Sequence, residues 1–212
     1  IEMLEPSFNQ MQVNPNIELG FADGVRALMR QDPDIIMVGE IRDHDTANMA
    51  IQAALTGHLV LSTLHTNDAP SSLTRLHDLG VQPFLTAATI LGVLAQRLVR
   101  RLCPHCKQQT AINEQEWEHL TFDYMMDMPT TMYKAVCCEV CRQTGYKGRV
   151  GIYEFMPVSL ELKSIIGGNG TLDNLRAQAK KEGIEPLRIA GARKVIEGVT
   201  TLEEVLRVVP LS

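Results

Sequence analysis

Polar residues suited to metal and phosphate chemistry stand at the ends of two apolar segments. Glu40 follows the apolar residues 35–38, and His65 follows a second apolar run over residues 59–64, which His58 precedes. A carboxylate after a buried strand can hold Mg²⁺ through water or polarise an attacking water. A core strand with a solvated turn, or a hydrogen-bonding histidine, would explain either segment alone. Two histidines bracketing a strand next to a Gly-Glu strand favour a functional site.

The five cysteines fall in two clusters, Cys103-Pro104-His105-Cys106 and Cys137-Cys138-Glu139-Val140-Cys141. Two C-x₂-C turns separated by roughly 30 residues have the spacing of a closed, four-thiolate zinc site. Choosing Cys138 over Cys137 keeps the two-residue spacing, and His105 could replace one thiolate. Free thiols or disulfides are the alternative, which the clustering in an acidic chain disfavours. The predicted zinc ligands are Cys103, Cys106, Cys138 and Cys141.

A strand–helix–strand unit has to position Glu40 and His65. Residues 45–55 have a helical pattern, and Thr56-Gly57-His58 forms a tight link to the second strand. The two strands should therefore be parallel neighbours whose carboxyl ends share one sheet edge. The four apolar residues 35–38 predict a first strand that is buried on both faces. The fold class is α/β.

The rest of the chain is mainly helical by pattern. After a predicted strand over residues 150–156, helices are expected over residues 160–166, 171–181, 186–197 and 202–208. Ser159 and either Thr200 or Thr201 should cap two of them. Residues 107–136 form a Met- and Thr-rich loop between the cysteine clusters, which we expect to be a loosely packed cover over a small core; an adaptable binding surface is the alternative. The expected helical core consists of Leu187, Ala190, Val195, Ile196, Val205, Leu206 and Val209.

Three motifs give the chain a family resemblance. Residues 32–43, Asp-Pro-Asp-Ile-Ile-Met-Val-Gly-Glu-Ile-Arg-Asp, resemble the atypical Walker B element of the secretion ATPases. These are the GspE/PilB/MshE motors of type II secretion and type IV pilus assembly. Residues 56–67 resemble the His box of that family, and Ile1-Glu2 resembles the end of its Asp box. The resemblance extends to about Val209, and the four cysteines favour the assembly motors over the retraction motors.

The resemblance implies the C-terminal portion of a RecA-like P-loop NTPase. It divides the chain into a partial ATPase core over residues 1–102, a zinc-binding subdomain over 103–148 and a mainly helical subdomain over 149–212. No Gly-x-x-x-x-Gly-Lys-Ser/Thr motif occurs in the sequence. Because that loop cradles the phosphates, the chain alone should not hydrolyse ATP. The implied cofactors are a structural Zn²⁺, with ATP and Mg²⁺ in the full-length protein.

The resemblance also assigns roles to individual residues. Glu2 is expected to be the base that orients the attacking water and Glu40 the residue near Mg²⁺, although the two roles could be exchanged. His65 would sense the γ-phosphate, and His58 would order the start of the second strand. Arg26 and Arg30, in a predicted helix over residues 21–30, would contact nucleotide or a neighbouring subunit; ion pairs on a solvated helix face are the alternative.

Arg97, Arg100 and Arg101 precede the first cysteine cluster, where we expect ion pairs or subunit contacts. The net charge of −5 and the pI near 5.7 argue against nucleic-acid binding.

The family resemblance implies a cytoplasmic homo-hexamer, bound to the inner membrane through platform proteins of the secretion or pilus machinery. A non-catalytic, zinc-containing adaptor of the same machinery is the alternative. The motifs do not separate type II secretion from type IV or mannose-sensitive pilus assembly.

Overall fold

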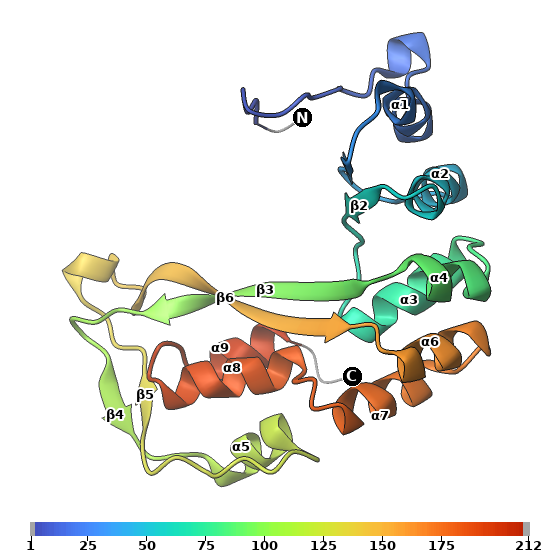
Figure 1. Ribbon diagram of the computed structural model, residues 1–212. Helices are drawn as coiled ribbons and strands as arrows, with labels where there is room; N and C mark the ends of the chain where they lie inside the picture. The colour runs from blue at the N-terminus through green and yellow to red at the C-terminus, as the bar shows by residue number, and fades with distance from the viewer. Residues whose placement is uncertain (1–2, 210–212) are drawn as a thin grey trace. The chain divides into compact units, whose positions relative to one another are not determined.

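The computed structural model describes residues 3–209, so Glu2 lies outside the described residues (Figure 1). The chain packs into two compact units. The first contains the chain up to Thr66 together with Pro70–Leu91 and Pro157–Gln178, and the second contains Asn67–Ala69, Gly92–Met156 and the chain from Ala179 onward. Among residues 3–209, no helix combines the length and the apolar character that spanning a bilayer requires.

A parallel βαβ motif is central to the first unit. Strand β1 (Ile35–Val38) pairs in parallel with β2 (Leu59–Ser62), and helix α2 (His44–Leu55) connects them. The register places Ile35 opposite Leu59 and Val38 opposite Ser62. Asp43 caps α2 by accepting a hydrogen bond from the Thr46 N–H at 2.8 Å. The predicted strand, helix and strand order is confirmed, although β2 is shorter than the expected strand over residues 59–64.

Only one face of β1 is buried. Ile36 and Val38 are each 2% exposed, whereas Ile35 is 59% and Met37 is 71% exposed. Helix α1 (Phe21–Leu28) and α2 supply the apolar side chains that pack on the buried face, namely Val25, Met49 and Ala53. The expectation of a strand buried on both faces was wrong for this chain, because no described residue covers Ile35 and Met37.

A second apolar cluster of the first unit consists of Ala47, Ile51, Leu76 and Val81. The helices that lie wholly or mainly in this unit also include α3 (Ala69–Asp78), α4 (Pro83–Thr89), α6 (Leu160–Gly167) and α7 (Leu172–Lys181), and α4 packs against α6. Two short 3₁₀ turns, η1 (Pro15–Ile17) and η2 (Met29–Gln31), flank α1. The helix expected over residues 21–30 therefore ends at Leu28 and continues as η2.

The second unit is organised on a long two-stranded ribbon. Strand β3 (Gly92–Leu102) pairs with β6 (Tyr146–Pro157), and the helices α8 (Leu187–Ile196) and α9 (Leu202–Val208) lie along it in Figure 1. The segment expected as a loop contains α5 (Glu114–Thr121) between β4 (Gln108–Thr110) and β5 (Met132–Lys134), which pair antiparallel. It is ordered because Trp117 and Leu120 are buried. The turn η3 (Glu139–Cys141) precedes β6.

The predicted starts of the C-terminal helices are confirmed. Ser159 Oγ accepts from the Leu162 N–H at 3.0 Å, and Thr201 Oγ1 accepts from the Glu204 N–H at 3.2 Å. Leu187, Val195, Val205 and Val209 are buried as expected, whereas Ala190 and Leu206 are half-buried. Ile196 does not belong to the core, because it is 43% exposed.

A buried carboxylate joins α9 to β3. Glu204 is 1% exposed, and it accepts hydrogen bonds from Arg100 Nη2 at 2.7 Å, from Arg100 N–H at 3.0 Å and from Arg207 Nη2 at 2.7 Å. Burial by itself would raise the pKa of the Glu204 carboxyl, but the bonds from Arg207 and Arg100 lower it from 4.5 to about 2. Arg100 therefore serves an ion pair.

Substituting Glu204 by Gln should lower the free energy of unfolding at pH 7 by about 1.5–3 kcal/mol, the range for hydrogen bonds to a charged group. Because the folded pKa lies below the unfolded one, this contribution is complete above about pH 4.5 and is lost as the pH falls towards about 2. Urea unfolding of both variants at pH 7 and pH 3 checks this. If the two proteins differed in the free energy of unfolding by the same amount at pH 7 and pH 3, the charge of Glu204 would not be the cause of the difference.

Candidate nucleotide site and cysteine cluster

The parallel pairing of β1 and β2 brings Glu40 and His65 together at one sheet edge. The Glu40 carboxylate lies 3.4 Å from His65 Nε2 and forms an ion pair with Arg42 Nη2 at 2.6 Å. The Glu40 side chain is only 21% exposed, whereas those of Arg42 and His65 are 72% and 88% exposed. A carboxylate is thus held at the edge, and two groups capable of positive charge face solvent beside it.

Arg42 is a partner of Glu40 that the sequence prediction missed. Residues two apart in an extended segment point to the same side, and the chain after β1 is neither helical nor turned between Glu40 and Arg42. That spacing was available in the sequence. The acidic group also keeps free acceptor positions, because an ionised carboxylate can accept about four hydrogen bonds.

His58 lies at the opposite end of β2 from His65. Its Nδ1 is 2.9 Å from the Ala53 carbonyl and 3.1 Å from Thr56 Oγ1, so the imidazole joins the end of α2 to the turn at Gly57. Gly57 has φ +100°, a conformation that L side chains rarely adopt. The structure therefore does not bring His58 to the Glu40–His65 edge.

Arg26 and Arg30 are separated by the end of α1. Arg26 lies on α1, pairs with Asp23 at 2.9 Å and contacts Met49 Sδ at 3.7 Å. Its side chain remains 55% exposed. Arg30 lies in η2 and is exposed. Both guanidinium groups are accessible to another molecule, and Arg26 also forms the surface ion pair considered as the alternative.

Four cysteine sulfurs form a compact cluster. The Sγ atoms of Cys103, Cys106, Cys138 and Cys141 all lie within 4.8 Å of one another. The Cys103–Cys138 and Cys106–Cys141 pairs are both 3.9 Å apart, and Cys138 and Cys141 are 3.6 Å apart. A tetrahedron with Zn–S bonds of about 2.3 Å has S–S edges of about 3.8 Å, so these positions fit that ion.

The fifth cysteine stands outside the cluster. Cys137 is exposed, and its Sγ donates to the Gln143 carbonyl at 3.1 Å. The second cysteine turn directs Cys138 and Cys141 inwards, and Cys141 Sγ accepts from the backbone N–H groups of Cys138 and Gly145. Gly145 adopts φ +76°, and a Cβ there would lie 2.7 Å from the Ala135 Cβ. Glycine is therefore required for this turn to close.

The crowded sulfurs change the acidity of one another. Burial and the neighbouring thiols raise the pKa of Cys106 to about 12. Burial would also raise the pKa of Cys141, but the N–H groups of Cys138 and Gly145 and the nearby thiols lower it to about 6. Four thiolates cannot share this volume without a compensating cation, which is the condition that a divalent metal satisfies.

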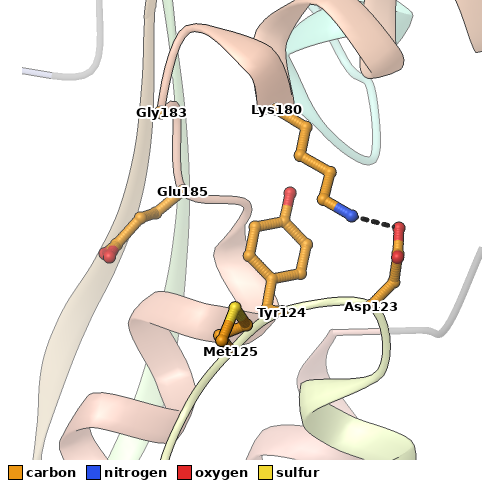
Figure 2. Close-up of a pocket in the computed structure, with 6 residues that line it drawn as sticks. All are labelled: Asp123, Tyr124, Met125, Lys180, Gly183 and Glu185. Atoms are coloured by element: carbon orange, nitrogen blue, oxygen red, sulfur yellow. Dashed lines mark ion pairs between the residues drawn. The ribbon is translucent and has the colours of Figure 1, made fainter.

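An open hollow of about 640 Å³ lies in the second unit between residues 123–125 and residues 180–185 (Figure 2). Lys180 and Asp123 form an ion pair within it. Lys180 Nζ and Arg188 Cζ lie 5.2 and 4.9 Å from the centre of the Tyr124 ring. These contacts hold the segment after α5 in place, so we interpret them as structural. The lining residues are Asp123, Tyr124, Met125, Lys180, Gly183 and Glu185.

Comparison with known proteins identifies the family. Residues 1–207 match the family described as Type II/IV secretion system protein. The chain belongs to this family. It is 76% identical to the type IV pilus assembly ATPase TfpB of Acinetobacter baylyi over all 212 residues, which are 36% of that protein. It is 50% identical to the type II secretion system protein E of Pseudomonas aeruginosa over 98% of the chain and 41% of that protein.

Solved structures of ATPases share the fold. The pilus retraction motor PilT with bound ADP superimposes with a TM-score of 0.61 at 24% identity, covering 89% of this chain and 43% of that chain. The Legionella pneumophila ATPase DotB gives 0.59 at 22% identity, over 88% and 41%. The chain thus spans about two fifths of the length of its relatives. The resemblance to secretion ATPases that the motifs predicted is confirmed.

Proposed function

We propose that this chain is the C-terminal part of a longer, hexameric motor ATPase. The motor would hydrolyse ATP on the cytoplasmic side of the inner membrane to drive assembly of a pilus or of a type II secretion pseudopilus. The observation that carries the proposal is the juxtaposition of Glu40 and His65, 3.4 Å apart, in a chain that belongs to the secretion family. The similarity to relatives named as pilus assembly ATPase and type II secretion system protein E also supports the proposed motor function.

Each candidate residue would have a separate role in phosphoryl transfer. Catalysis of this kind consists almost entirely of positioning and charge stabilisation. Mg²⁺, when bound with ATP, supplies positive charge to the phosphates. Glu40 would hold the water shell around that ion, His65 would donate to the γ-phosphate, and Glu2 would orient the attacking water. Arg26 and Arg30 would contact nucleotide or the adjacent subunit, where guanidinium charge stabilises the transferring group.

Zinc would act in the second unit as a structural ion. The four sulfurs of Cys103, Cys106, Cys138 and Cys141 would complete a tetrahedral shell around the ion and leave no open position for a substrate. The ion would join the end of β3 to the turn η3, two segments far apart in the sequence. It would thereby stabilise the zinc-binding subdomain over residues 103–148, between the partial ATPase core over 1–102 and the mainly helical subdomain over 149–212.

Partners follow from the motor assignment. We propose a homo-hexamer that contacts inner-membrane platform proteins. We also propose that it does not bind nucleic acid, and the net charge of −5 supports this last point. A non-catalytic, zinc-containing adaptor of the same machinery is the second candidate, in which the cysteine cluster and the C-terminal helices would contact partner proteins. The coding sequence upstream of Ile1 discriminates the two, because a motor requires a Gly-x-x-x-x-Gly-Lys-Ser/Thr loop there.

Zinc analysis tests the metal assignment. The purified chain should contain about one zinc ion, and Cys138→Ser should lose it because a tetrahedral site needs all four ligands. Cys137→Ser is the matched control and should keep the metal. Inductively coupled plasma mass spectrometry measures both. Zinc retained in the Cys138 variant and lost in the Cys137 variant would move the ligand to Cys137.

Substitution of the acidic residues tests the catalytic assignment. In the complete protein, Glu40→Gln and Glu2→Gln should each lower kcat by about 10²-fold or more, the scale of a lost general base or metal-shell residue. ATP binding should largely survive, because the phosphate loop is unchanged. Steady-state hydrolysis and nucleotide titration measure the two quantities. Unaltered turnover in both variants would overturn the proposed roles.

The isolated 212-residue chain should neither hydrolyse ATP nor bind it tightly, because the edge offers charged groups without a phosphate cradle. Isothermal titration calorimetry with ATP and Mg²⁺ measures the affinity, and the complete protein is the positive control. A micromolar Kd for the chain alone would place the whole nucleotide site within it.

A further inference from the structure

Thr63 brackets Glu40 with two hydrogen bonds. Its hydroxyl donates to the Gly39 carbonyl at 2.7 Å, and its own carbonyl accepts from the Ile41 N–H at 3.0 Å. Gly39 and Ile41 are the chain neighbours of Glu40 on either side. A single residue of the neighbouring segment therefore holds the backbone on both sides of the carboxylate-bearing residue.

These bonds act where the regular sheet has already ended. The β1–β2 ladder stops at Val38 opposite Ser62, so Glu40 has no place in it. Gly39 is also closely packed, since a Cβ there would lie 3.3 Å from the Phe21 ring. The Thr63 bonds therefore extend the pairing of the two segments by one step, to the residues on either side of Glu40.

Thr63 also lies on the segment that carries His65. The residue that fixes the backbone at Glu40 is two positions before the imidazole that faces the Glu40 carboxylate at 3.4 Å. Thr63 therefore links the backbone around Glu40 directly to the segment that carries His65. Small errors in such positions reduce the rate of reactions that depend on alignment.

We propose that Thr63 is a positioning residue, whose hydroxyl holds Glu40 at the height required for ATP hydrolysis; this rests on the motor function proposed above. Valine keeps the β-branched shape that suits extended backbone, but it cannot donate to the Gly39 carbonyl. Serine keeps the donor and loses only a methyl group. The two substitutions therefore separate the hydrogen bond from the shape of the side chain.

Kinetics of the complete protein test the proposal. Thr63→Val should lower kcat by about threefold to tenfold, the range for one orienting hydrogen bond, with KM for ATP within about twofold. Thr63→Ser should stay within about twofold of wild type. Thr89→Val is the matched control, because that hydroxyl also donates to a backbone carbonyl, of Leu85 at 2.8 Å. It should leave kcat unchanged.

A double-mutant cycle separates positioning from general structural damage. If Thr63 acts through Glu40, adding Thr63→Val to Glu40→Gln should produce no further loss in single-turnover rate. The same fractional loss in both backgrounds would overturn the proposal. Thr63 is exposed, so thermal midpoints should be unchanged; should the valine variant unfold, Thr63→Ala takes its place with the same expectation.

The outcomes distinguish this proposal from the proposed function. Wild-type kcat in Thr63→Val, together with a large loss in Glu40→Gln, would overturn only the role of Thr63. Wild-type kcat in Glu40→Gln would overturn both, because Thr63 would then have no catalytic group to position.

Discussion

The parallel pairing of β1 with β2 is the constraint on which the candidate nucleotide site depends. Parallel neighbours place both carboxyl ends at the same edge, whereas an antiparallel pair would separate Glu40 from His65 by the length of a strand. The register is equally important, because a shift of one residue turns every side chain to the other face. Ile36 and Val38, buried under α1 and α2, resist that shift.

Helix α2 packs closely enough on the two strands to allow this pairing. Its buried side is lined by small and medium side chains, so the helix can lie close to the strands that it joins. Asp43 caps its first turn, and His58 with Thr56 joins its last turn to the start of β2. Local signals at both ends of the helix therefore support the long-range pairing. The buried residues are Thr46, Ala47, Met49, Ala50, Ile51 and Ala53.

The second unit depends on neutralising buried polar groups. Glu204 is balanced by two arginines, and Glu154, 3% exposed, accepts from the N–H groups of Ala69 and Leu187 at 3.3 and 3.2 Å. Leu187 begins α8, where unpaired N–H groups attract a carboxylate. The four cysteine sulfurs are a further polar cluster of this unit, and they lie close enough together to hold one metal ion. Hydrogen bonds to buried carboxylates thus stabilise this unit together with its apolar core.

The sequence alone determined the features that depend on neighbours along the chain. Hydrophobic period, capping residues and glycine turns predicted the βαβ order and the starts of the C-terminal helices, and C-x₂-C spacing selected the four sulfurs that the fold brings together. Tertiary structure alone decided that one face of β1 is exposed, that α5 forms within residues 107–136, that Ile196 lies outside the core and that Glu204 is buried between Arg100 and Arg207. These features depend on which distant element packs against a residue, and no local pattern in a single sequence records that partner.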